Sequence, residues 1–205
     1  MESSKRLPER LLPLVLALSF AACGWESHAQ PAHSSLRLHV DPQVRAGGDV
    51  RLRVTVEHSG TPCRSMYVDP VISPFRHPSR PVMQLTLKLH DAAGRVQKPP
   101  AVPFAQTMMG ARPEHLFLLE CGTIIGRYVH LSRFGWDELP PGEYSGTMTL
   151  TADTRTFVMK HPGYLEQLMQ ISSSSRAAVL ERLAETRAET TFRVVVPAPG
   201  RSNSK

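Results

Sequence analysis

The chain has 205 residues, with 24 Lys plus Arg against 18 Asp plus Glu and a formal net charge of +6. Beyond the first 23 residues about 180 remain, the length of one domain with room for an insertion. The basic residues are scattered and form no run of about five or six, the pattern of nucleic-acid-binding tails, so we expect no nucleic-acid partner.

The N-terminus has the pattern of an export signal. Lys5, Arg6 and Arg10 precede an apolar run over residues 11–22. That run is shorter than the roughly 20 residues that a membrane-spanning helix needs, so a cleaved signal is favoured over a transmembrane anchor.

Cleavage of this signal has two candidate positions. Phe20-Ala21-Ala22-Cys23 resembles the lipobox of bacterial lipoproteins, which implies a lipid on Cys23 and an anchor in the cell envelope. Gly24 after the cysteine resembles the default for sorting to the outer membrane. Cleavage before Gln30, after Ser27-His28-Ala29, would instead release a soluble periplasmic or secreted protein. In a third interpretation Cys23 is an ordinary small residue at the end of the apolar run.

Two further cysteines, Cys63 and Cys121, lie in the remainder of the chain. In an exported protein the compartment is oxidising and a cysteine pair can persist, so we predict a Cys63–Cys121 disulfide. Such a bridge would contribute roughly 4 kcal/mol in the chain-entropy model. The alternative is a pair of unpaired buried thiols.

The region after the signal reads mainly as strands. Apolar and polar residues alternate over residues 36–40, 50–56, 83–89 and 144–151, which is the pattern of a strand with one buried face. Further strands are expected over residues 124–131 and 191–196. Residues 70–81 and 99–103 are rich in proline and predict loops. Apolar residues at helical spacing predict two short helices between 164 and 187, and the serines at 172–175 offer N-caps for the second.

Three stretches resemble bacterial immunoglobulin-like envelope domains: residues 44–56, residues 87–96 and Leu139-Pro140-Pro141-Gly142-Glu143-Tyr144, where the tyrosine is expected to fold back on the preceding corner. The resemblance implies a mainly β fold, an immunoglobulin-like antiparallel β-sandwich with a short helical insertion before the last strand. A jelly roll or small barrel is the alternative. The expected organisation is a signal segment at 1–23, a linker at 24–35, the domain at 36–197 with its insertion at about 164–188, and a disordered tail at 198–205.

Motifs that would indicate an enzyme or a metal centre are missing from the sequence. It contains no Cys-x-x-Cys, no His-Glu-x-x-His and no Gly-x-Ser-x-Gly. Met108, Met109 and His115 form the densest group of copper-type ligands, but loop or core methionines explain them better. We therefore predict no catalytic residues, no metal site and no cofactor.

The proline-rich segment is the candidate partner-binding loop, because it combines apolar and arginine side chains of the kind found in protein interfaces: Val71, Ile72, Phe75, Arg76, His77 and Arg80. The helical pair is expected to cover one end of the sandwich. The sequence thus predicts a non-enzymatic cell-envelope lipoprotein, a binding or structural accessory module with a protein or glycan partner. The alternatives are a proteinase inhibitor presenting the loop at 70–81 and, less favoured, a periplasmic metal carrier.

Overall fold

The computed structural model describes residues 35–45, 48–60, 63–77, 80–100 and 113–198. The expected signal segment with Cys23, all but the last residue of the expected linker, Met108, Met109 and residues 199–205 of the expected tail lie outside the described residues.

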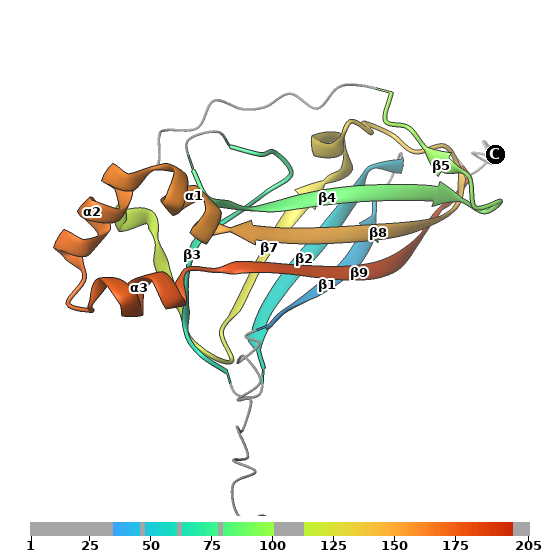
Figure 1. Cartoon of the computed structure of the whole chain (residues 1–205). Helices are drawn as coiled ribbons and strands as arrows, with labels where there is room; N and C mark the ends of the chain where they lie inside the picture. The colour runs from blue at the N-terminus through green and yellow to red at the C-terminus, as the bar shows by residue number, and fades with distance from the viewer. Residues whose placement is uncertain (1–34, 46–47, 61–62, 78–79, 101–112, 199–205) are drawn as a thin grey trace, which may run out of the picture. The chain divides into compact units, whose positions relative to one another are not determined.

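The described chain is mainly β and forms two sheets (Figure 1). The first sheet is antiparallel and has the order β1-β2-β7: β1 (Ser35–Val44), β2 (Val50–Ser59) and β7 (Ile124–His130). The second has the order β6-β3-β4-β8-β9, with β5 beside β4: β3 (Met66–Ser73), β4 (Val82–Asp91), β5 (Val96–Gln97), β6 (Phe117–Leu119), β8 (Gly142–Asp153) and β9 (Glu185–Val196).

Both sheets contribute to one hydrophobic core. Residues of β2 such as Leu52 and Val54 belong to the same buried cluster as Leu85 of β4 and Leu150 of β8. In β2 the buried side chains recur at every second residue, as the alternation in the sequence predicted. The expectation of a mainly β domain is therefore confirmed. Two 3-10 turns, η2 (Pro113–His115) and η3 (Leu131–Phe134), flank β6 and β7.

One strand pair departs from the predicted antiparallel arrangement. β3 and β4 are parallel, with Asp69 opposite Val82 and Ser73 opposite Gln84. Parallel neighbours ordinarily need a long crossover connection. Here residues 74–81 suffice, because only the last part of β3 pairs with the first part of β4. β3 itself was not predicted, since Pro70 within it and Pro74 just after it indicated a loop over residues 70–81.

Three helices lie between β8 and β9 at one end of the second sheet (Figure 1): α1 (Thr154–Lys160), α2 (Pro162–Ile171) and α3 (Arg176–Arg182). They build a second hydrophobic cluster around Val158, Leu165 and Val179. Ser175 caps α3, and its hydroxyl accepts a hydrogen bond from the Ala178 amide at 3.3 Å, which confirms the predicted role of the serine run.

The expected limits of the insertion, about 164–188, are wrong at both ends. The first helix begins at Thr154, and β9 begins at Glu185 rather than at 191. β9 pairs with β8 over its whole length, from Glu185 opposite Asp153 to Val196 opposite Gly142. That pairing provides hydrogen-bond partners for the backbone N–H and C=O groups of residues 185–190. The side chains of these residues alone did not indicate a strand.

The predicted disulfide is present, and Cys63 and Cys121 have their Cα atoms 6.0 Å apart. Cys63 precedes β3 and Cys121 follows β6, so the bridge joins the two strands at one end of their pairing. Among the described residues, no helix is both long and apolar enough to span a membrane.

Candidate functional site

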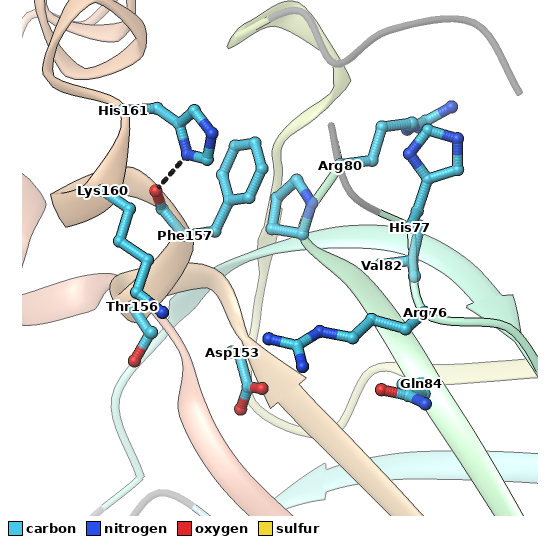
Figure 2. A pocket seen from close by; sticks show the side chains of 11 residues that line it. Arg76, His77, Arg80, Val82, Gln84, Asp153, Thr156, Phe157, Lys160 and His161 are labelled. Atoms are coloured by element: carbon cyan, nitrogen blue, oxygen red, sulfur yellow. Dashed lines mark hydrogen bonds between the residues drawn. The ribbon is translucent and has the colours of Figure 1, made fainter.

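A pocket of about 380 Å³ lies beside helix α1, where the connection between β3 and β4 passes the end of β8 (Figure 2). One side is formed by the connection and the start of β4: Arg76, His77, Arg80, Pro81, Val82 and Gln84. The other side is formed by the end of β8 and by α1 with the residue after it: Asp153, Thr156, Phe157, Lys160 and His161.

A buried ion pair holds the connection in place. Asp69 of β3 is fully buried, and its Oδ2 accepts a hydrogen bond from Nε of Arg80 at 2.9 Å. Nη2 of Arg80 lies 2.8 Å from the same oxygen in the ion pair. Its Oδ1 accepts from the Val71 amide at 3.0 Å. Because the Arg80 side chain is only 14% exposed and its charge is matched by Asp69, we assign it a positioning role rather than ligand binding.

Aromatic rings form the wall on the helix side. The rings of Phe157 and His161 stack with their centroids 4.2 Å apart, and Phe157 meets Tyr164 edge-on at 5.4 Å. Nδ1 of His161 donates a hydrogen bond to the Phe157 carbonyl at 2.8 Å, which fixes the ring orientation. Burial, with a smaller contribution from the charge of Asp69, raises the pKa of Tyr164 to about 12. The phenol behind this wall therefore stays neutral at physiological pH.

The charged groups of the pocket favour an anion. With Arg80 matched by Asp69, two cations remain, Arg76 from the connection and Lys160 from the last turn of α1, against the single carboxylate of Asp153. Figure 2 shows Arg76 reaching in from the connection and Lys160 approaching from the helix. Cations beside an aromatic wall suit a ligand that joins an acidic group to a ring or apolar body. The one carboxylate of the described lining does not make the pair that glycoside hydrolysis requires.

The structure divides the predicted partner-binding residues into three places. Arg76, His77 and Arg80 line the pocket. Val71 and Ile72 belong to β3 rather than to a loop, and Ile72 is buried in the main core. Phe75 lines a separate small hollow with residues of β7. The connection is thus shorter than the segment 70–81 predicted from prolines.

The helix side of the pocket was missed in the sequence. Phe157, Lys160 and His161 were not selected, because the alternation predicted a strand only as far as 151 and the helical spacing predicted the first helix only from 164. The aromatic pair at positions i and i+4 is the signal that pointed to a helix, since such residues share one helix face.

No protein-family model matches the chain, and the searches of curated proteins and of solved structures find no match either.

Proposed function

We propose that this protein is a non-enzymatic binding module of the bacterial cell envelope, exported by its N-terminal segment and held at a membrane by a lipid on Cys23. The support for export and lipid attachment is the basic and apolar pattern of residues 5–20, followed by Ala21-Ala22-Cys23. The Cys63–Cys121 disulfide is consistent with an oxidising compartment.

We also propose that the two-sheet domain is immunoglobulin-like. The supporting observation is the corner before β8, where the Tyr144 hydroxyl donates a hydrogen bond to the Pro140 carbonyl at 2.9 Å. Immunoglobulin-like domains have a tyrosine whose hydroxyl bonds to the backbone a few residues upstream. The parallel β3–β4 pair and the three helices would then be additions to that plan.

The ligand we propose is an acidic glycan, and the observation that carries this is that Arg76, Lys160 and the Phe157–His161 stack line one pocket. A concave pocket of about 380 Å³ has the size of a small-molecule site and accommodates one or two sugar rings. Protein partners instead bury roughly 800 Å² per side over a broader surface. The proteinase-inhibitor alternative receives less support, because residues 70–73 lie within β3.

Binding of a uronic-acid oligosaccharide, measured by calorimetry, tests this proposal. We expect the acidic oligosaccharide to bind and its neutral counterpart of equal length to bind at least about tenfold more weakly, because hydrogen bonds to charged groups contribute about 1.5–3 kcal/mol. Arg76→Gln and Lys160→Gln should each weaken binding by about tenfold or more.

Arg155→Gln is the matched control, because Arg155 is exposed on the same helix and is not among the residues that line the pocket. Its affinity should equal that of the unchanged protein. Equal binding of acidic and neutral oligosaccharides, or full affinity in both pocket variants, would contradict the proposed site. Binding of an acidic peptide but of no glycan would move the assignment to a protein partner.

A further inference from the structure

A second group of reactive side chains lies at the C-terminal end of β2, and none of its residues lines the proposed glycan pocket. His58 is fully buried, and its Nε2 is 3.7 Å from Sγ of Cys63. The ligand atoms of His58, Cys63 and Cys121 all lie within 4.8 Å of one another. We call these three residues the His–Cys corner.

The tautomer of His58 leaves a lone pair directed at the sulfurs. Nδ1 is 3.1 Å from the Glu120 carbonyl oxygen, which can only accept, so Nδ1 carries the hydrogen. In the neutral imidazole Nε2 is then an acceptor, and the disulfide sulfur beside it has no hydrogen to donate. In metal-binding histidines one ring nitrogen usually donates a hydrogen bond, often to a backbone carbonyl, and the other nitrogen binds the metal. Nδ1 and Nε2 of His58 have these two roles available.

Main-chain hydrogen bonds hold the corner together independently of the disulfide. The His58 amide donates to the Thr123 carbonyl at 3.0 Å, and the Gly122 amide donates to the His58 carbonyl at 2.8 Å. The turn that carries Cys121 is therefore fixed to His58 by backbone contacts and by the imidazole itself. Cys63 follows His58 by five residues. Both thiols should consequently stay close to the ring after the disulfide is opened.

The spacing of the nitrogen and the sulfur already fits a shared zinc ion. With Zn–S near 2.3 Å and Zn–N near 2.0–2.1 Å, a tetrahedral ion places its nitrogen and sulfur ligands roughly 3.6 Å apart. The Nε2 to Sγ distance of 3.7 Å is close to that value. Two thiolates and one imidazole with an open fourth position form a known type of zinc site.

We propose that reduction of the Cys63–Cys121 disulfide converts the His–Cys corner into a binding site for Zn²⁺, with Nε2 of His58 and the two sulfurs as ligands. The reductant is a dithiol. One of its thiolates attacks Sγ of the exposed Cys121 and releases the Cys63 thiolate; its second thiol then displaces Cys121, and the reductant leaves as its own disulfide. Zn²⁺ binding displaces the remaining thiol protons. This proposal does not depend on the glycan site.

Zinc titration of the full-length chain tests the proposal, with Cys23→Ser in every sample so that the corner holds the only thiols. The protein is reduced with a phosphine and titrated with Zn²⁺ against a chromophoric indicator, and with Co²⁺ to observe thiolate-to-metal absorption. We expect one ion per reduced chain, bound at least about 100-fold more tightly than by the oxidised protein, which has the same nine histidines but no thiolate.

His58→Gln should weaken zinc binding by about 100-fold or more, since loss of an outer-shell contact alone costs 10- to 100-fold. His39→Gln, an exposed histidine on the neighbouring strand β1, is the matched control and should bind like the unchanged protein. Thermal melts of the oxidised variants establish that each folds. The proposal would be overturned if the reduced and oxidised proteins bound zinc with equal affinity, or if His58→Gln kept full affinity for zinc. It would also be overturned if the reduced chain unfolded and zinc did not restore its fold.

Discussion

At the scale of single residues, Asp91 shows how one carboxylate organises a turn. Its Oδ1 accepts hydrogen bonds from the Ala93 and Arg95 amides at 3.0 and 2.9 Å, and its Oδ2 accepts from Nε of Arg95 at 2.8 Å. These contacts, the Arg95 amide foremost, lower the pKa of Asp91 below its ordinary value of 3.8. The ionised carboxylate is therefore the form that stabilises the hairpin between β4 and β5.

Asp91→Asn should lower the melting temperature at pH 7. Because the pKa of Asp91 is lower in the folded than in the unfolded chain, its contribution is complete above about pH 4 and is lost as the pH falls through the folded value. The difference in melting temperature between the two proteins should therefore shrink in acid. Scanning calorimetry from pH 7 downward measures it, and a difference independent of pH would contradict the role given to the charge.

Several individual residues could be predicted from the sequence, and His58 shows why others could not. The cysteine count indicated the disulfide, and the resemblance of residues 139–144 implied that Tyr144 folds back on the preceding corner; the Cys63–Cys121 bridge and the hydrogen bond from Tyr144 to the Pro140 carbonyl confirm both. His58 continues the inward alternation of β2 after Val56, so its burial was readable. The sequence did not indicate that His58 lies close to Cys121, because that distance depends on how segments far apart in the chain pair with one another.

At the scale of elements, the β8–β9 pair contains a close contact between a glycine and a ring. Gly146 lies opposite Phe192, and a Cβ on Gly146 would stand 2.3 Å from Cζ of that ring. Gly146→Ala should therefore displace Phe192 and destabilise the fold by about 1–3 kcal/mol, as overpacking does. Urea unfolding measures the loss.

The double variant Gly146→Ala with Phe192→Leu tests the cause. The smaller side chain makes room for the added methyl group, so the double variant should lose less stability than the sum of the two single losses. Strict additivity would mean that the ring is not what excludes the methyl group.

Sequence patterns predicted the long strands better than the elements around the pocket. In β2, β4 and β8 apolar and polar residues alternate in the sequence because one face of each strand is largely buried and the other is more exposed. β3 contains Pro70, and α1 begins with two threonines among three residues, so local preference opposed the structure in both. β3, through the connection that follows it, and α1 form the candidate site. In both elements tertiary contacts outweigh the secondary-structure preference of the local sequence.

At the scale of the whole molecule, the proposed anchor has a mass signature. We expect the protein extracted from bacterial membranes to begin at Cys23 and to carry acyl chains, with a gain of two hydrogens on reduction of the Cys63–Cys121 bridge. Intact mass spectrometry before and after reduction measures both. A chain that begins at Gln30 without lipid would establish a soluble exported protein and contradict the anchor.

The helices occupy an interruption of one β-hairpin. Asp153 and Glu185 are paired neighbours, and the Arg155 amide donates to the Ala184 carbonyl at 3.0 Å, so the chain leaves and rejoins the sheet at adjacent points. A tight two-residue turn would close the same hairpin. The segment that supplies Phe157, Lys160 and His161 is therefore tied to the hairpin only where it begins and ends, and its other contacts are with residues such as Tyr67 of β3 and Leu116. The register of β8 and β9 thus does not depend on which side chains the inserted helices present to the pocket.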